Sequence, residues 1–230
     1  MSDQILPRHV GIIMDGNRRW ARSHNLPTLK GHAKGQEVLR EVAKHGFTRG
    51  VRYITVYAFS TENWRRAEEE VGYLMSQMQR ALKKYADEFV ENGIKIVFLG
   101  TREGLPKKVL AAIEEAEAKT SNGTKGTLGI CFNYGGQLEI VDALKKIIAE
   151  GITGEDITPE LLSAHLYGPE LPPIDLVIRT SGEQRLSNFM LWRAAYSELY
   201  FTEKCWPDFT GADLDIAIEE YARRGRRFGG

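Results

Sequence analysis

Polar and charged side chains follow directly after several short apolar runs of this 230-residue sequence. In parallel α/β proteins, ligands bind at the carboxyl ends of the strands, so chemistry is expected at these positions. The segments are DGNRRW (residues 15–20), FSTENWRR (59–66), NYGG (133–136) and RTSGEQR (179–185). They combine carboxylates, amides, hydroxyls and arginines, and guanidinium groups bind phosphate oxygens bidentately. This inventory predicts a cleft for one or two diphosphates together with a metal ion.

The turn at residues 15–17 has the composition of an anion site and of a metal site. Gly16 lets the backbone approach a ligand closely, and a helix with free N–H groups is predicted directly after it. Asp15 is a candidate ligand for Mg2+, which takes one or two protein carboxylates and completes its shell with water and phosphate oxygens. A structural Asx turn fits the same residues. A phosphatase of the haloacid dehalogenase type needs a second aspartate where Asn17 stands.

Short β-branched runs alternate with longer helical patterns, which is typical of a parallel α/β sheet. The runs predict strands at residues 10–14, 53–58, 94–99, 127–132, 175–179 and 199–201. Helices are predicted from about residue 18 and at 32–45, 71–89, 106–120, 138–150, 159–165 and 212–223. We expect an α/β fold with a single domain over residues 1–230, in which helices flank a mostly parallel sheet of about six strands.

The predicted helix at 71–89 carries an apolar stripe at three- and four-residue spacing. Its members are Val71, Leu74, Met75, Met78, Leu82, Tyr85 and Phe89. Such a stripe packs against a sheet in an ordinary core, and the wall of a lipid-lined cavity needs the same residue types. Both interpretations are open on the residues alone.

Charge balance and cysteine usage narrow the class of protein. Lys plus Arg number 31 and Asp plus Glu also number 31, so no overall field attracts nucleic acid or an anionic membrane. Cys131 and Cys205 lie outside any CxxC pattern. This argues against a disulfide framework or a zinc site and fits a reducing cytoplasm. No run of about 18 apolar residues occurs, so no membrane-spanning segment is predicted.

Seven motifs, in order along nearly the whole chain, resemble those of one known family. They are HVGIIMDGNRRWA (9–21), GHAKG (31–35), YAFSTENWRR (57–66), FNYGGQLEI (132–140), DLVIRTSGEQRLSNFMLWRAAYSELYF (175–201), WPDF (206–209) and RRFGG (226–230). The chain resembles the cis-prenyltransferases, which include undecaprenyl diphosphate synthase.

The resemblance implies the fold of that family, with an apolar tunnel, and a Mg2+-dependent activity. Isopentenyl diphosphate would condense with an allylic diphosphate of the farnesyl or geranyl type to give a Z-polyprenyl diphosphate such as undecaprenyl diphosphate. The resemblance further implies a cytoplasmic homodimer that touches the membrane surface peripherally, without a nucleic-acid partner.

The resemblance also implies roles for individual residues. Catalytic roles fall to Asp15 and Asn63, and metal binding to Asp15 and Glu198. Binding of the allylic diphosphate falls to Gly16, Asn17, Arg18, Arg19, Trp20, His32, Ser60, Thr61, Glu62, Trp64 and Arg66. Binding of isopentenyl diphosphate falls to Arg179, Arg185, Leu186 and Ser187, and to a tail with Arg227, Phe228 and Gly229 that completes the site of a homodimeric partner.

The growing chain of such an enzyme needs an apolar tunnel. Its candidate walls are Ala58, Leu74, Met78 and Phe132. Phe132 is bulky, which predicts a product of medium length. Asn63 is a neutral amide without useful proton affinity, so a positioning or relay role is favoured over that of a base.

Two positions depart from the bacterial pattern of the family. Arg18 stands where bacterial members usually have glycine, and Thr28 stands where many of them have an arginine that contacts diphosphate. Lys30 brings a charge nearby but not the bidentate geometry of guanidinium. The role of that arginine is therefore not carried over to this chain.

A noncatalytic partner subunit is the alternative within the same family, and a phosphohydrolase is the alternative outside it. A noncatalytic subunit is expected to lack the catalytic aspartate and part of the arginine set. Asp15, Arg179 and Arg185 are all present, which favours the enzyme.

Overall fold

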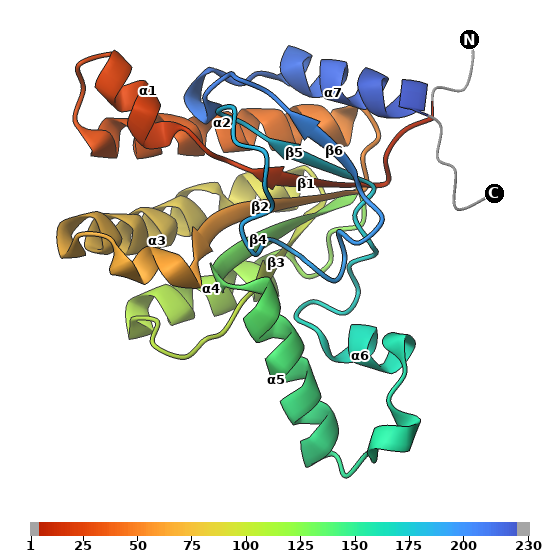
Figure 1. Ribbon diagram of the computed structural model, residues 1–230. Helices are drawn as coiled ribbons and strands as arrows, with labels where there is room; N and C mark the ends of the chain where they lie inside the picture. Colours follow the sequence, from red (N-terminus) through yellow and green to blue (C-terminus); the bar gives the residue numbers. More distant parts are fainter. Residues whose placement is uncertain (1–4, 225–230) are drawn as a thin grey trace.

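A six-stranded sheet forms the centre of the molecule (Figure 1). The computed structural model describes residues 5–224. The strands are β1 (His9–Ile13), β2 (Tyr53–Ser60), β3 (Ile94–Leu99), β4 (Gly126–Tyr134), β5 (Leu176–Arg179) and β6 (Glu198–Phe201), in the spatial order β3-β4-β2-β1-β5-β6. Every neighbouring pair is parallel. The predicted α/β fold with a mostly parallel sheet of about six strands is confirmed.

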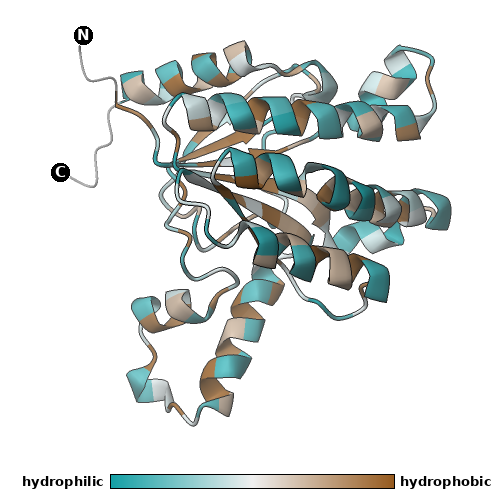
Figure 2. Ribbon diagram, turned by 180° about the vertical axis from the view of Figure 1, so that it is seen from behind, coloured by the Kyte–Doolittle hydropathy of each residue, from teal (hydrophilic) through white to brown (hydrophobic). Residues whose placement is uncertain are grey.

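Helices and a long connecting segment cover the two faces of this sheet. The helices are α1 (Asn17–Ser23), α2 (Thr28–Thr48), α3 (Glu68–Glu91), α4 (Lys107–Thr120), α5 (Gly136–Ala149), α6 (Pro159–His165) and α7 (Gly211–Arg224), with single turns η1 (Thr61–Arg65), η2 (Gly154–Asp156) and η3 (Trp206–Asp208). Figure 2 shows mainly hydrophobic strands between helices of mixed hydropathy. In residues 5–224, none of these helices has both the length and the apolar character to cross a membrane.

The strands send alternate side chains into two cores, as the period of two requires. Ile12 and Ile178 join the larger core, which α2, α3, α4 and α7 cover. Their neighbours Ile13 and Val177 join a second core, which is covered by Phe189 and other residues of the connection between β5 and β6. The sheet is therefore buried on both faces, which explains why its strands appear in the sequence as continuous apolar runs.

Helices α5 and α6 extend away from the sheet as a pair (Figure 1). They share a small core of Ala143, Ile147, Leu162 and Leu166. At the base of α5, Arg193 Nη1 donates to Glu139 Oε1 at 2.9 Å, and the two side chains are only 4% and 1% exposed. The hydroxyl of Tyr134 donates to the other oxygen of Glu139. This fully bonded carboxylate fixes α5 to the body.

The largest difference from the predicted boundaries is at the start of α2. The sequence pattern predicts a start at residue 32, but α2 begins at Thr28, directly after Pro27. Gly31 and Gly35 obscure the first turn in the sequence because glycine is a poor helix former. Both glycines are nevertheless needed there, because α1 lies against them.

His9 begins β1 and has no exposed surface. Its Nδ1 lies 2.8 Å from the carbonyl oxygen of Pro172, and its Nε2 lies 2.7 Å from Thr55 Oγ1. A carbonyl only accepts, so Nδ1 carries the proton and Nε2 of the neutral ring accepts from the Thr55 hydroxyl. Burial lowers the pKa of His9 to about 4, although the hydrogen bond to Pro172 acts in the opposite direction.

The buried neutral His9 predicts a loss of stability in acid. Its folded-state pKa lies below the ordinary value of 6.5, so its contribution to stability is present above pH 6.5 and is lost as the pH falls towards 4. Over this range we expect the unfolding free energy of the wild type to fall by about 3 kcal/mol more than that of His9→Gln. Urea titrations at several pH values measure this difference. Parallel pH profiles of the two proteins would contradict it.

Candidate active site

Asp15 follows β1 in a turn that neighbouring loops fix. Its backbone oxygen accepts hydrogen bonds from Thr180 Oγ1 at 2.7 Å and from Trp206 N at 2.9 Å. Gly16 has a φ of 103°, and a Cβ at this position would lie 2.8 Å from Ser181 Oγ. Only glycine fits such a conformation in so little space. The turn therefore holds the Asp15 carboxylate in one place, with 33% of the side chain exposed.

Asn17 begins α1 and packs against α2 at two glycines. A Cβ at Gly31 would lie 2.1 Å from Asn17 O, and one at Gly35 would lie 2.3 Å from Asn17 Oδ1. Asn17 Nδ2 donates to Met14 O at 3.3 Å, but Oδ1 is buried without a hydrogen-bond partner in the part of the chain described. Buried acceptors are rarely left unpaired. The close fit of α1 on α2 is therefore kept at a cost in hydrogen bonding.

Arg179 ends β5 and forms an ion pair with Asp15. The register between β1 and β5 places Ile13 beside Arg179. Arg179 Nη2 donates to Asp15 Oδ2 at 2.9 Å although only 4% of its side chain is exposed, and its Nη1 donates to Ser187 Oγ at 2.8 Å. Arg19 Nη2 lies 3.7 Å from the same oxygen of Asp15. One buried and one half-exposed cation thus face this carboxylate.

The loop after β5 has unusual backbone geometry and joins two other loops. Positive φ angles occur at Ser181, Ser187, Asn188 and Met190. Such angles are costly for residues other than glycine and persist only where the surroundings fix them. Asn188 Nδ2 donates to Glu62 Oε1 at 3.1 Å, and its Oδ1 accepts from Gln137 N at 2.8 Å. Burial raises the pKa of Glu62, but its hydrogen bonds outweigh burial and leave the pKa below its ordinary value.

The loop after β2 is tied to its own strand and to β4 by side-chain hydrogen bonds. Asn63 Oδ1 accepts a hydrogen bond from Ser60 N at 3.1 Å, which fixes the plane of its amide. Trp64 Nε1 donates to Asn133 Oδ1 at 2.7 Å, so the ring is tied to the end of β4. The loops after β2, β4 and β5 therefore support one another through side-chain hydrogen bonds.

One carboxylate, Glu70 on α3, holds two further residues of the site. Glu70 Oε1 accepts from His32 Nε2 at 3.0 Å and from Arg66 Nη1 at 3.1 Å. His32 is 8% exposed and Glu70 is 11% exposed. Burial lowers the pKa of His32, and the hydrogen bond that His32 donates to Glu70, which raises this pKa, only partly offsets the effect. His32 is thus neutral near pH 7, with its proton on Nε2.

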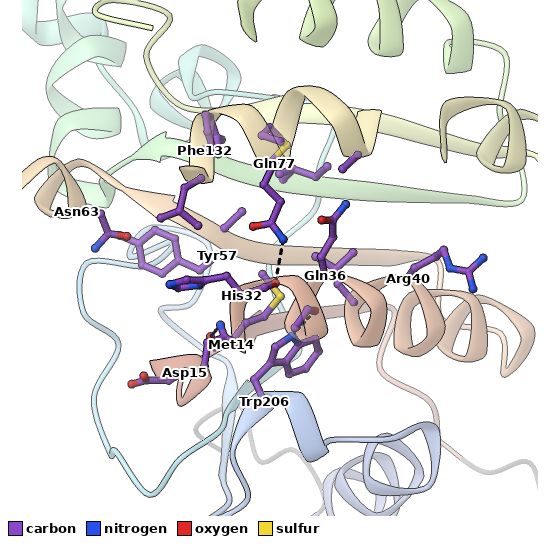
Figure 3. A pocket seen from close by; sticks show the side chains of 18 of the residues that line it. Met14, Asp15, His32, Gln36, Arg40, Tyr57, Asn63, Gln77, Phe132 and Trp206 are labelled. Atoms are coloured by element: carbon purple, nitrogen blue, oxygen red, sulfur yellow. Dashed lines mark hydrogen bonds between the residues drawn. The ribbon is translucent and has the colours of Figure 1, made fainter. Parts of the chain in front are cut away.

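Two cavities meet at this group of residues. The long cavity, about 600 Å3 in volume, runs between α2, α3 and the sheet (Figure 3). The arginine cavity, about 520 Å3, is lined by Arg179, Ser187 and Asn188 among others. Both are lined by Met14, Asp15, Tyr57, Asn63 and Arg66. Asp15 therefore lies at the junction between an elongated pocket and a polar one.

The residues predicted to bind an allylic diphosphate divide into three groups. Gly16, Asn17, Arg18, Arg19, His32 and Arg66 line the long cavity, and Ser60 and Glu62 line the arginine cavity. Thr61, Trp64 and Trp20 line neither. Trp20 instead donates from Nε1 to Asp208 Oδ1 at 2.7 Å and stacks on His24 at 4.3 Å. Its side chain points away from the junction and anchors α1 to η3.

The residues predicted to bind isopentenyl diphosphate also divide. Arg179 and Ser187 line the arginine cavity. Arg185 is 58% exposed and donates to Glu183, and Leu186 packs on the second core. Glu183 has a lowered pKa because Arg185 donates to it. The predicted tail residues Arg227, Phe228 and Gly229 lie outside the described residues.

Glu198 does not lie beside Asp15 within the chain, and its role as a second metal-associated carboxylate stays a prediction. Glu198 pairs with Leu176 at the amino ends of the strands, whereas Asp15 follows the carboxyl end of β1. At about 3.3 Å per residue, the two ends of these short strands are roughly 10 Å apart. Glu198 Oε2 accepts from Arg224 Nη1 at 3.3 Å instead.

The donor set at the junction fits a cation only in part. No group of three or more His, Cys, Asp or Glu side chains that could hold a metal ion occurs within residues 5–224. Asp15 supplies one carboxylate where the two cavities meet. Mg2+ is commonly held by one or two carboxylates together with substrate phosphates and water. The residues therefore fit an ion that arrives with, and is completed by, a phosphorylated ligand.

The apolar stripe of α3 serves two purposes. The predicted walls Ala58, Leu74, Met78 and Phe132 all line the long cavity. Phe89 lines it as well, whereas Val71 and Met75 are buried in the larger core and line none of it. The two interpretations of the stripe thus apply to different residues of the same helix.

Three residues of the site were missed in the sequence. Glu70 lies four residues after Arg66, and this spacing of opposite charges on a helix was an available signal. Tyr57 lines both cavities, donates from its hydroxyl to Ser187 O at 3.3 Å and has a pKa that burial raises. Asn188 gave no signal, because its role depends on a positive φ and on loops far apart in the sequence.

Comparison with known proteins identifies the family. Residues 13–229 match the prenyltransferase family model described as undecaprenyl diphosphate synthase. The chain belongs to this family. The isoprenyl transferase of Thermotoga maritima is 48% identical over 227 residues, which cover 98% of this chain and 97% of the relative. The isoprenyl transferase of Neisseria meningitidis serogroup B is 48% identical over 224 residues, or 97% of this chain and 90% of the relative.

Solved structures place the fold in the same family. Lavandulyl diphosphate synthase from Lavandula x intermedia, in complex with dimethylallyl diphosphate, has a TM-score of 0.95 and 35% identity, over 99% of this chain and 100% of that one. A probable undecaprenyl diphosphate synthase from Campylobacter jejuni has a TM-score of 0.83 and 28% identity, over 97% and 99%. The resemblance seen in the motifs is confirmed, and the protein is a transferase of the prenyl diphosphate synthase type.

Glu70 is expected to control the protonation of His32. Glu70→Ala removes the neighbour whose hydrogen bond and charge raise the pKa of His32, so this pKa should fall further. A titration of the ring-proton resonances by NMR measures it. His165, whose pKa is raised by Leu161 and Glu150, serves as the internal control and should not change. A His32 pKa equal to that of the wild type would show that the contact with Glu70 has no electrostatic role.

Proposed function

We propose that this enzyme condenses isopentenyl diphosphate with an allylic diphosphate of the farnesyl or geranyl type and releases diphosphate, giving a Z-polyprenyl diphosphate such as undecaprenyl diphosphate. The observation that carries the proposal is the meeting of two cavities at Asp15. The long cavity, with Leu74, Met78 and Phe132 in its walls, suits a prenyl chain. The arginine cavity, with Arg179, suits a second diphosphate.

The allylic diphosphate binds where the long cavity begins. Arg18, Arg19 and Arg66 line this part of the cavity and offer guanidinium donors for phosphate oxygens. Arg18 is the residue that replaces the usual bacterial glycine. In this chain Thr28 stands where many bacterial members have an arginine that contacts diphosphate. Arg18 supplies positive charge at the same cavity.

The diphosphate of isopentenyl diphosphate binds in the arginine cavity. Arg179 and Ser187, which are hydrogen-bonded to each other at 2.8 Å, present a cation and a hydroxyl there. Because Arg179 also bonds to Asp15, a diphosphate on Arg179 lies next to the carboxylate at the junction. The binding role of Arg185, which faces Glu183, remains a prediction.

The reaction breaks the bond between C1 of the allylic group and its diphosphate oxygen. The terminal alkene carbon of isopentenyl diphosphate bonds to C1, the electron pair of a C2–H bond forms the new double bond, and the proton passes to a diphosphate oxygen. The electron pair of the broken bond leaves with the diphosphate. Arg19 and Arg66 are placed to stabilise this growing negative charge, and the two cavities hold the reacting carbons in one orientation.

Mg2+ is the cofactor that we propose for this site. Asp15 would hold it together with phosphate oxygens and water, as the single carboxylate at the junction suggests. Such an ion neutralises charge on a leaving diphosphate. Asn63, whose carbonyl oxygen accepts from Ser60 N, lines both cavities and positions the substrates rather than acting as a base.

The proposal includes assembly as a homodimer and peripheral contact with the membrane surface that receives the product. Both follow from the family resemblance. Sedimentation of the pure protein and flotation with phospholipid vesicles measure them independently of activity.

The test of the proposed function is a direct assay. The protein is incubated with Mg2+, labelled isopentenyl diphosphate and allylic starters of several lengths, and the products are identified by mass spectrometry. Z-polyprenyl diphosphates that require both substrates are expected. Release of phosphate from simple phosphomonoesters without any elongation would instead indicate a phosphohydrolase.

Asp15→Ala is expected to lower turnover by a factor on the order of 10^3, because the carboxylate at the junction of both substrates is lost. Steady-state kinetics measure the loss, and circular dichroism verifies the fold. Glu170→Ala, which removes a surface carboxylate paired with Lys95, is the control and should keep wild-type turnover. Near-normal turnover of Asp15→Ala would remove this residue from the mechanism.

Phe132→Ala is expected to lengthen the product. Phe132 is 4% exposed and lies in the wall of the long cavity, so removing its ring enlarges the space for the chain. Mass spectrometry of the products measures the shift. If the variant gave the product lengths of the wild type, Phe132 would not limit chain growth.

A further inference from the structure

A third cavity lies beyond the far end of the long cavity. This distal cavity, about 250 Å3 in volume, is lined by residues that include Arg40, Lys44, Phe47, Glu88, Phe89 and Ile94. Two of these residues, Arg40 of α2 and Phe89 of α3, also line the long cavity. Figure 3 places Arg40 at the opposite end of the long cavity from Asp15. Arg40 and Phe89 thus border both cavities.

An ion pair between α2 and α3 spans this boundary. Arg40 Nη1 donates to Glu88 Oε2 at 2.9 Å and to Glu88 Oε1 at 3.2 Å. Lys44 Nζ lies 4.0 Å from Glu88 Oε1. The Arg40 guanidinium also lies over the ring of Tyr85, 5.4 Å from its centre. Charged groups therefore meet at the end of a cavity whose middle section is apolar.

This boundary has the properties of a stop that can be opened. Arg40 and Glu88 are 38% and 28% exposed, so solvent screens their attraction and the pair is weak. An apolar chain end that reaches them would have to strip water from two charges, which opposes further growth. Beyond the pair, Phe47 and Ile94 again offer apolar surface. The desolvation cost of extending the chain is therefore concentrated at the ion pair.

We propose that Arg40, Glu88 and Phe89 form a gate that sets product length, and that the distal cavity receives the end of the prenyl chain when the gate is open. This inference rests on the proposed function, because it takes the occupant of the long cavity to be the growing chain. It makes Arg40 and Glu88 specificity-determining residues that touch neither diphosphate.

The double variant Arg40→Met with Glu88→Met tests the gate. It keeps unbranched side chains of high helix propensity at both positions while it removes both charges. Products are expected to be longer by roughly one to two isoprene units, because the chain end no longer meets a desolvation cost. The charge-swapped variant Arg40→Glu with Glu88→Arg restores a pair and should return the length towards that of the wild type.

A second ion pair between helices gives a matched control. Arg49, which directly follows α2, lies with its Nε 2.9 Å from Oδ1 of Asp215 on α7. The side chains are 39% and 29% exposed, and neither residue lines the three cavities. Arg49→Met with Asp215→Asn should leave product length unchanged. An equal shift in this control would mean that any loosening of α2 changes the length. A folded, active Arg40/Glu88 double variant with wild-type products would overturn the gate.

A binding measurement separates failure of the gate from failure of the proposed function. Non-hydrolysable prenyl thiolodiphosphates of increasing length are titrated into each protein by calorimetry. The affinity of the wild type should stop rising at a certain length of the prenyl compound. The double variant should bind the next longer compound roughly tenfold more tightly than the wild type does. If the wild type makes no polyprenyl product but this limit moves, the proposed function and the effect on product length fail, while Arg40 and Glu88 still limit how far a bound prenyl chain reaches. If elongation occurs and the limit stays fixed, the gate is wrong. Arg40→Met alone, subject to the same criteria, replaces the double variant if that protein does not fold.

Discussion

The ion pair between Asp15 and Arg179 is the interaction on which the rest of the site depends. A guanidinium that is 4% exposed carries a large desolvation cost, which close partners must offset. Asp15 Oδ2 and Ser187 Oγ do so at 2.9 and 2.8 Å. They can meet because β1 and β5 are neighbours in the sheet, with Ile13 beside Arg179. Sheet order thus brings together two charges that lie 164 residues apart in the chain.

The loops around this pair are fixed by contacts that leave little freedom. Gly16 has no space for a Cβ, and the hydrogen bonds of Asn188 connect the ends of β2, β4 and β5. Glu70 holds His32 and Arg66 at the entrance of the long cavity. The donors are therefore held in place by contacts within the protein. Preorganised groups of this kind need little rearrangement when charge develops on a bound diphosphate. This small rearrangement is the main electrostatic advantage of an enzyme over water.

The sequence was most informative where charged residues stand at the ends of predicted strands. Each strand of this sheet is a self-contained apolar run, and Asp15 and Arg179 follow directly from their positions at strand ends. Glu198 precedes a predicted strand, so the sequence already indicates that it lies at the amino edge of the sheet, away from Asp15. The direction of the Trp20 side chain could not be inferred, because a motif does not give the rotation of a helix. Nor could the pairing of Arg40 with Glu88, which depends on how α2 lies along α3.

The long cavity has a cause that can be traced to one helix. Successive residues of an α-helix are separated by about 100°, so the seven residues of the stripe lie within roughly 100° of one another around the axis of α3, which is the usual width of a core-facing stripe. Leu74 and Met78, towards one side of this stripe, line the cavity, whereas Val71 and Met75, towards the other side, are buried in the core. Phe89 lies about five turns after Val71 at nearly the same angle, yet it lines the cavity. The way α3 lies along the sheet, rather than the width or the hydrophobicity of the stripe, therefore decides which apolar side chains pack in the core and which border the cavity.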